Sequence, residues 1–305
     1  MLTRICIMFK RYPVKASLLG VWLCLLLLTQ SYSLIIEYGG FLFLGIVGAI
    51  FANATGAGGG VVFVPFFNHL SLSSETIVAT SFAIQCFGMT AGAVTWYRHY
   101  RGLQNQLPAQ PLVAKQWQSL GKGLLILVPF SISGMFVAQY LLYDYTNQIQ
   151  AGLHFYFGLF SIVLAMAIYG SIPFMHRQTN ICKLLFIDII ALSVISLIGG
   201  VITAWLSIGV GELVAVYLIL RGFNISFAIA LAVILSAFTV QAAIIYHLTI
   251  SHAIYWQIVL YAGAGAIMGG IIAKHVVLRF SPVKLKIFFG TWVLIMGIAG
   301  LPFWS

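Results

Sequence analysis

A run of glycines interrupts an apolar segment between Thr55 and Pro65. The segment reads Thr-Gly-Ala-Gly-Gly-Gly-Val-Val-Phe-Val-Pro. Glycine and proline both disfavour the interior of a helix. In a bilayer, the backbone N–H and C=O groups that such a break frees have no water to bind, so the break must be buried in protein or line a wet cavity. The run therefore predicts a helix break at which a polar species binds or passes.

The composition places this break inside a membrane. Hydrophobic residues make up 62% of the 305 residues, charged residues make up 7%, and the mean hydropathy is +1.06. Too few polar side chains remain to coat a soluble domain. Because one helical span needs about 20 apolar residues, the chain has room for about eight core spans plus an N-terminal span. We expect an all-α polytopic membrane protein with no separate soluble domain.

The distribution of charge predicts the topology. Residues 1–36 combine a basic start with an apolar run, which is typical of a signal anchor or a cleavable signal peptide, and we favour the anchor. The basic loop from Arg98 to Lys122 is then cytoplasmic, whereas the loop at Asp144 carries no basic residue and is external. Residues 37–305 form one domain of the cell (cytoplasmic or inner) membrane. The N-terminus, if uncleaved, is cytoplasmic and the C-terminus is external.

Two apolar runs, 61–70 and 212–220, are too short to cross a membrane and follow matching breaks. A shift of 151 residues (209 minus 58) lays Gly58 on Gly209 and Gly60 on Gly211. By the distribution of basic residues, the first unit begins outside the membrane and the second begins inside. The sequence therefore predicts two inverted repeats with broken helices, at about 38–172 and 183–303, which is a known transporter plan with its site near the midplane.

The first half also resembles a known family. Three segments carry the resemblance, Gly56-Ala-Gly-Gly-Gly-Val-Val-Phe-Val-Pro65, Ala79-Thr-Ser-Phe-Ala83 and Ala91-Gly-Ala-Val-Thr-Trp-Tyr-Arg98. They resemble the TauE/SafE sulfite exporter family in order and spacing, over about Gly39 to Trp304. The resemblance implies a multi-pass permease that exports sulfite or an organosulfonate. The second half departs from the family pattern, because Ala230-Leu-Ala232 replaces Ala-Thr-Ser and the Val-Pro is absent.

The breaks offer a binding site for an anion. The N-terminus of the half-helix that follows a break carries a partial positive charge, and glycine amides can approach an oxyanion closely. Neighbouring hydroxyl and amide side chains can add hydrogen bonds. An alternative is that the glycines only permit close helix packing. We expect the substrate-binding residues to be Asn53, Thr55, Gly56, Gly58, Gly59, Gly60, Thr80, Ser81, Gln85, Ser207, Gly209 and Gly211.

Glu212 begins the second half-helix, where an acid is costly at membrane depth and usually functional or paired. Its mirror position is Val61. Three interpretations are open: Glu212 carries a coupling proton, it pairs with Arg221, or it caps its own half-helix. Proton coupling is the hypothesis we carry forward, because an acid beside an anion fits joint transport of anion and proton. For Asp188 we expect an interfacial position or a pair with Lys183.

The remaining features point to no enzyme, metal or cofactor. The histidines and the four cysteines have no ligand spacing, and no Walker motif is present. The partners we expect are a small anionic substrate and the lipid bilayer. The small-residue helices at 88–92 and 263–270 would let the halves slide or two copies dimerise. Nucleic acid is not expected. The leading prediction is a secondary, proton-coupled anion permease, and the alternative is a non-transporting membrane subunit or assembly factor of the same fold.

Overall fold

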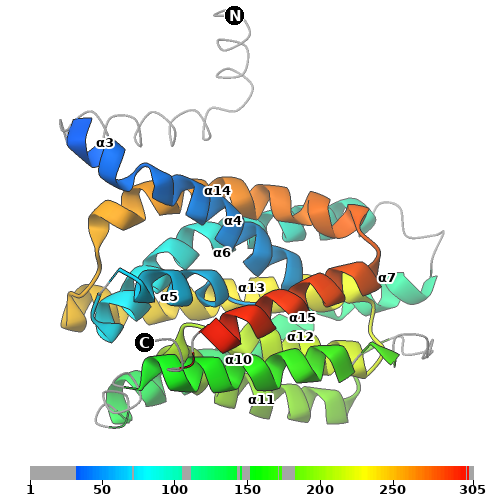
Figure 1. Cartoon of the computed structure of the whole chain (residues 1–305). Helices are drawn as coiled ribbons and strands as arrows, with labels where there is room; N and C mark the ends of the chain where they lie inside the picture. The colour runs from blue at the N-terminus through cyan, green and yellow to red at the C-terminus, as the bar shows by residue number, and fades with distance from the viewer. Residues whose placement is uncertain are drawn as a thin grey trace, which may run out of the picture. The chain divides into compact units, whose positions relative to one another are not determined.

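The computed structural model contains helices and no strands in the part of the chain that it describes, which comprises residues 32–70, 72–104, 111–142, 145, 152–170, 172–173, 183–299 and 301. The elements, labelled as in Figure 1, are α3 (Tyr32–Tyr38), α4 (Gly40–Thr55), α5 (Gly60–Asn68), α6 (Ser74–Gln104), α7 (Pro111–Gln118), α8 (Leu120–Phe136), η2 (Val137–Leu141), α10 (Leu153–Gly170), α11 (Phe186–Leu206), α12 (Val210–Leu220), α13 (Ile225–Tyr246), η4 (His247–Ser251), α14 (Trp256–Arg279) and α15 (Pro282–Ala299).

The chain divides into two compact units, Met1–Gly40 and Phe41–Ser305. Of the first unit, residues 1–31 lie outside the described residues, and so does most of the predicted anchor. The second unit holds both glycine breaks and all the helices from α5 onward. The predicted domain boundaries, 1–36 and 37–305 with repeats at about 38–172 and 183–303, stay predictions.

Six helical segments among the described residues are long and apolar enough to cross a membrane. They are Ser33–Thr55, Ser74–Leu103, Leu120–Leu141, Phe186–Leu206, Ile225–Ser251 and Trp256–Arg279. Three shorter apolar helices, Phe155–Gly170, Val210–Leu220 and Lys286–Ala299, accompany them. The fold is that of an all-α polytopic membrane protein, as the composition predicts.

Both predicted breaks are real interruptions of the helices. α4 ends at Thr55 and α5 begins at Gly60, while α11 ends at Leu206 and α12 begins at Val210. α5 has 9 residues and α12 has 11. At a rise of about 1.5 Å per residue they cover roughly half of a hydrocarbon core about 30 Å thick. Neither short helix can cross the membrane, which confirms the prediction for both runs.

Each short helix folds back along the long helix before it. Phe41, in the first turn of α4, contacts the rings of Phe66 and Phe67 near the end of α5, with centroids 6.1 and 6.2 Å apart. In the second half, Asp188 at the start of α11 pairs with Arg221 just after α12, at 2.7 Å. Each broken pair is therefore a hairpin whose tip is the glycine break, and we name them hairpin 1 (α4–α5) and hairpin 2 (α11–α12).

The packing of the helices repeats between the halves. Matching α4, α5, α6, α8 and α10 with α11, α12, α13, α14 and α15 in order, α6 packs on its own counterpart α13, and α10 packs on its counterpart α15. α6 packs on α14 just as α13 packs on α8, and α5 contacts α15 just as α12 contacts α10. Exchanging the halves therefore leaves this set of contacts unchanged, which is the property of an internal two-fold axis between two repeats.

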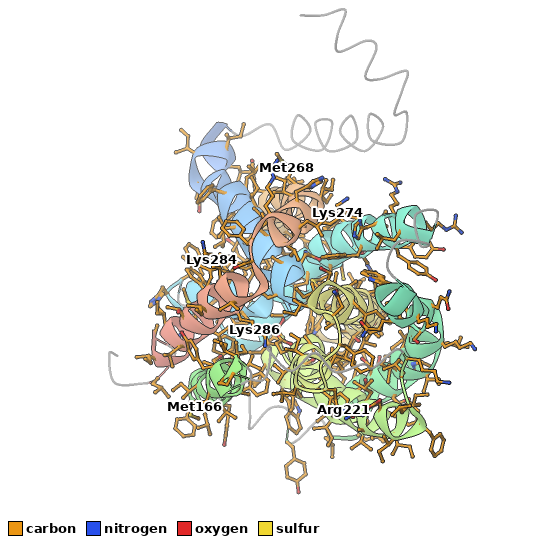
Figure 2. All side chains as sticks on the ribbon, turned by 90° about the vertical axis from the view of Figure 1, so that its right-hand side faces the viewer. Met166, Arg221, Met268, Lys274, Lys284 and Lys286 are labelled. Carbon is orange, nitrogen blue, oxygen red and sulfur yellow. The ribbon has the colours of Figure 1, made fainter. Side chains whose placement is uncertain are left out.

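Basic side chains occur on several separate elements of the second unit. Figure 2 labels three of them, Lys274 of α14, Lys284 of α15 and Arg221 just after α12, which lie apart from one another in this view. Cytoplasmic loops are rich in Lys and Arg. The predicted topology, in which the loops after α6 and α14 lie on one side, stays a prediction.

The small-residue stretches serve packing within the molecule. A side chain at Gly265 would collide with the backbone of Leu42, and one at Gly270 would collide with the carbonyl oxygen of Gly88. α4, α6 and α14 thus approach one another to backbone distance, as small residues allow in membranes. The glycines of the stretches at 88–92 and 263–270 therefore bring these helices together within one copy, and dimerisation through these helices stays a prediction.

The hairpin tips pack against each other in a reciprocal way. A methyl group on Gly60 would collide with the carbonyl oxygen of Ser207, and one on Gly211 would collide with the carbonyl oxygen of Gly56. Gly211 follows Gly60 by the same 151 residues that separate Ser207 from Gly56. The two tips are in backbone contact at the internal axis, and they require glycine at both crossing points.

Gly211→Ala should destabilise the protein by about 1–3 kcal/mol, because the added methyl group overpacks the contact with Gly56 and with the hydroxyl of Ser236. Thermal unfolding of the purified protein in detergent measures this loss. The matched control is Gly121→Ala on α8, where a methyl group meets no atom within 4 Å. Equal melting temperatures for the two variants would contradict the close contact of the tips.

Candidate functional site

The carboxylate of Glu212 joins the two hairpin tips. The backbone N–H of Gly58 donates to its Oε1 and the backbone N–H of Gly209 donates to its Oε2, both at 2.8 Å. The side chain is buried, with 1% exposure. Gly58 and Gly209 are counterparts in the repeat, so the carboxylate bridges two equivalent amides, one from each half. Backbone amides that converge in this way form an anion site, and in this structure the chain's own carboxylate fills it.

The local sequence explains why Glu212 points back to the tip. It is the third residue of α12 and reaches the N–H of the N-cap residue Gly209, which lies at φ 149°, a conformation suited to glycine. Of the three interpretations of Glu212, the helix cap is therefore present in the structure. The pair with Arg221 is not formed, because Arg221 binds Asp188 instead. A role for Glu212 in proton coupling stays a prediction.

Gln85 of α6 makes a second bridge between the tips. Its Oε1 accepts from the N–H of Gly59 at 2.8 Å, and its Nε2 donates to Oγ of Ser207 at 2.8 Å and to Oγ of Ser81 at 3.0 Å. The Ser207 hydroxyl donates in turn to Ser81, at 2.9 Å. All three side chains are buried. This network presents N–H and O–H groups next to the amides that Glu212 occupies.

Ser207 adopts a left-handed backbone conformation, with φ 61°, that a non-glycine residue rarely takes. Its counterpart in hairpin 1 is Gly56, at φ 83°. Glycine would adopt this conformation without strain, yet hairpin 2 carries a side chain here, and its hydroxyl binds both Gln85 and Ser81. Strain of this kind concentrates at functional sites, which marks Ser207 as a candidate.

The other predicted polar residues have local roles. Thr55 donates to the carbonyl of Phe51 at 2.7 Å and accepts from the N–H of Ala57 at 3.2 Å, so it closes the end of α4. Thr80 accepts from the N–H of Tyr255 at 3.0 Å. Neither side chain makes a described hydrogen bond to the tip amides of Gly58 and Gly209. The remaining predicted glycines have no side chain and so let neighbouring segments approach the backbone closely; they are Gly56, Gly60 and Gly211.

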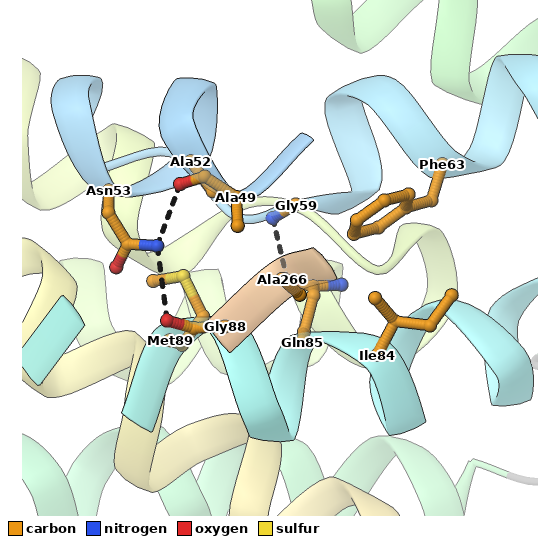
Figure 3. A pocket seen from close by; sticks show the side chains of 10 residues that line it. All are labelled: Ala49, Ala52, Asn53, Gly59, Phe63, Ile84, Gln85, Gly88, Met89 and Ala266. Atoms are coloured by element: carbon orange, nitrogen blue, oxygen red, sulfur yellow. Dashed lines mark hydrogen bonds between the residues drawn. The ribbon is translucent and has the colours of Figure 1, made fainter. Parts of the chain in front are cut away.

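Asn53 lies beside the network, at the edge of a narrow space between α4, α5, α6 and α14 (Figure 3). Its Nδ2 donates to the carbonyls of Ala49 at 2.8 Å and Gly88 at 3.2 Å, whereas its Oδ1 is buried without a partner among the described residues. Gln85 and Phe63 also line this space, which is too narrow to hold a water molecule. This space beside hairpin 1 therefore has no room for a bound molecule.

Two residues near the site were missed by the sequence analysis. Thr203 of α11 accepts from the N–H of Val210 at 2.9 Å and so satisfies the first amide of α12. Ser236 of α13 has a buried hydroxyl that finds no partner in the described part of the chain and lies against Gly211. The repeat could have indicated Ser236, because it follows Gln85 by 151 residues (236 minus 85).

Asp188 closes the base of hairpin 2. Its Oδ1 accepts from Arg221 Nε at 2.7 Å and from the Tyr217 hydroxyl at 2.9 Å, and its Oδ2 accepts from the N–H of Leu185 at 3.1 Å. The hydrogen bond to Asp188 raises the pKa of Arg221 above its usual value. The expected pair with Lys183 is therefore wrong. The sequence could not give this pair, since Asp188 and Arg221 lie 33 residues apart and meet only when the hairpin closes.

The comparison with protein families settles the class. The family model described as "Sulfite exporter TauE/SafE" matches residues 41–300. The chain belongs to the sulfite exporter TauE/SafE family. The matched region includes both hairpins, Gln85 and Glu212, so the TauE/SafE domain contains the whole network described above. TauE/SafE proteins are membrane transporters, and this chain is accordingly assigned to a transporter family.

No curated protein and no solved structure matches the chain at a significant level. Within the described residues, no group of three or more His, Cys, Asp or Glu side chains could hold a metal ion. The class of function therefore rests on membership of the TauE/SafE family, and the candidate site rests on the geometry of the hairpin tips.

Replacing Ser207 separates its strain from its hydrogen bonds. Ser207→Ala and Ser207→Gly both remove the hydroxyl from Gln85, but only glycine also relieves the left-handed backbone, by about 1 kcal/mol. We expect both variants to melt below the wild type and the glycine variant to melt above the alanine variant, as measured by thermal unfolding. An alanine variant that is at least as stable as the glycine variant would contradict the strained conformation.

Proposed function

We propose that this protein is a secondary permease for a small anion, with its substrate site between the tips of hairpins 1 and 2. By family resemblance the substrate is sulfite or an organosulfonate and the direction is export. The observation that carries the proposal is the placement of the Glu212 carboxylate on the N–H groups of Gly58 and Gly209. A carboxylate and a sulfonate both present oxygen atoms that share negative charge, so the same amides suit either group.

Glu212 and the substrate would then exclude each other. A carboxylate that holds both amides leaves them no hydrogen for a second anion, and two negative charges in one buried site repel each other. Protonation weakens the hold of Glu212 on the amides, because a neutral acid is a poorer acceptor than a carboxylate. A proton on Glu212 together with a bound anion keeps the charge of the site unchanged. This exchange would couple the movement of an anion to that of a proton.

Transport requires the tips to separate. The tips touch through backbone atoms at Gly60 and Gly211, and Gln85 and Ser207 join them by a side-chain bond. Inverted repeats of this kind move against each other to expose a central site to each side in turn. We propose that the closed arrangement is the occluded, substrate-free state, in which Glu212 fills the substrate's place.

Purified protein in liposomes tests the function directly. With sulfite or sulfoacetate on one side and an imposed proton gradient, we expect anion flux that stops when the gradient is collapsed by a protonophore. Protein-free liposomes and liposomes that contain Glu212→Gln are run in parallel. Absence of gradient-dependent flux for every small anion tried would support the alternative, a non-transporting membrane subunit of the same fold.

The coupling role of Glu212 predicts a specific pH dependence. Wild-type flux should rise as the pH falls, because protonation frees the amides of Gly58 and Gly209, and Glu212→Gln should give a flat pH profile. Val61→Ala at the mirror position is the matched control and should keep the wild-type profile. The exchange Val61→Glu with Glu212→Val returns a carboxylate to the opposite side of the axis and should restore part of the pH dependence. If the pH profile of Glu212→Gln equals that of the wild type, Glu212 acts only as a helix cap and not in proton coupling.

A further inference from the structure

A polar contact lies at the crossing of α6 and α13, away from the hairpin tips. Nε2 of Gln241 donates to Oγ1 of Thr90 at 2.9 Å and to the carbonyl of Cys86 at 3.3 Å. Gln241 follows Thr90 by 151 residues, which is the shift that relates Gly58 to Gly209. The two residues are therefore counterparts in the repeat, and a direct contact between counterparts lies on the internal two-fold axis.

The position on the axis fixes the depth of this contact. In an inverted repeat the axis lies in the plane of the membrane, so residues on it sit near the middle of the bilayer. Thr90 and Gln241 are both exposed. Water is absent at that depth, and a polar side chain there is costly unless it meets another polar group. The contact between Thr90 and Gln241 satisfies only part of their hydrogen-bonding capacity.

Exposed apolar residues surround the polar pair in the same symmetric arrangement. Phe87 and Val94 of α6 are 45% and 43% exposed, and their counterparts Phe238 and Ile245 of α13 are 52% and 48% exposed. We name the resulting patch the axial surface; it consists of Phe87, Thr90, Val94, Phe238, Gln241 and Ile245.

The unused groups of the polar pair complement each other. Both described bonds of Gln241 use its Nε2, which leaves Oε1 as an acceptor without a partner among the described residues. Thr90 accepts from Gln241, and its own O–H group donates to no described acceptor. The axial surface therefore presents one free donor beside one free acceptor. In a two-fold dimer each copy presents the same surface, so each donor can meet the other copy's acceptor.

We propose that the axial surface is the contact between two copies of this chain in the membrane. The Thr90 hydroxyl of each copy donates to Oε1 of Gln241 of the partner subunit, and the flanking phenylalanines pack around the two bonds. Lipid tails offer no hydrogen-bonding group to this pair. Polar side chains that bond between helices are a recognised source of association in membranes. This proposal is independent of the substrate and of the role of Glu212.

Self-association of the full chain in liposomes tests the proposal. Protein labelled separately with a donor and an acceptor dye is diluted over a series of lipid-to-protein ratios, and energy transfer gives the dimer dissociation constant. Thr90→Val and Gln241→Leu should each weaken the dimer by about tenfold to about a thousandfold, because each variant removes both symmetry-related bonds and one interhelical hydrogen bond is worth about threefold to thirtyfold. The matched control is Thr291→Val on α15, because Thr291 is also exposed, lies on a helix outside the axial surface and bonds within the chain to Ile287 and Tyr169; its dimer should be as tight as that of the wild type.

A second pair of variants distinguishes loss of the dimer contact from a general effect on folding. Phe238→Ala trims the axial surface without touching a hydrogen bond, whereas Phe155→Ala trims an exposed ring on α10. We expect only Phe238→Ala to weaken the dimer. A protein that stays monomeric at every dilution would overturn the proposal. So would a dimer that Phe238→Ala and Gln241→Leu leave as tight as the wild type, because the contact would then lie on another face.

Discussion

The bridge between Glu212 and the amides of Gly58 and Gly209 is the interaction on which the rest of the structure depends. A buried carboxylate is costly unless hydrogen bonds compensate it, and these two backbone groups supply that compensation. Each amide is available only because a helix is broken beside it, since N–H groups inside a helix are already bonded. The glycine breaks, the short half-helices and the buried acid therefore form one arrangement, in which each part makes the others possible.

The packing of the helices is symmetric between the two halves, whereas the side chains at the candidate site are not. Backbone contacts between the tips, the helix pairing and the axial surface all follow one internal two-fold relation. The side chains at the site do not, because Glu212 has Val61 as its counterpart in the repeat and Gln85 has Ser236. A symmetric scaffold places two sets of equivalent amides together, and unequal side chains then give the site one acid and one amide bridge. This explains how the second half could lose the family's glycine pattern and keep the geometry.

The same relation separates packing residues from site residues. The small residues of α6 and α14 bring backbones together inside the molecule, so their composition says little about partners. Exposed polar groups on the axis carry more information, because nothing in the membrane satisfies them. Burial therefore decides how a polar or small residue in a membrane helix is interpreted, and burial is a property of the packed structure.

The sequence by itself determined the class of fold, the two breaks, the short half-helices and the repeat, because hydropathy, glycine runs and a fixed spacing act locally along the chain. It also identified Gly58, Gly209, Gln85, Ser207 and Glu212 as candidates. Only the tertiary structure decided which groups meet. Glu212 binds an amide 154 residues away and not Arg221, nine residues on, while Asp188 binds Arg221 and not Lys183. These choices depend on how the two hairpins pack against each other, and the spacing of residues along one chain does not record the distance between two packed tips.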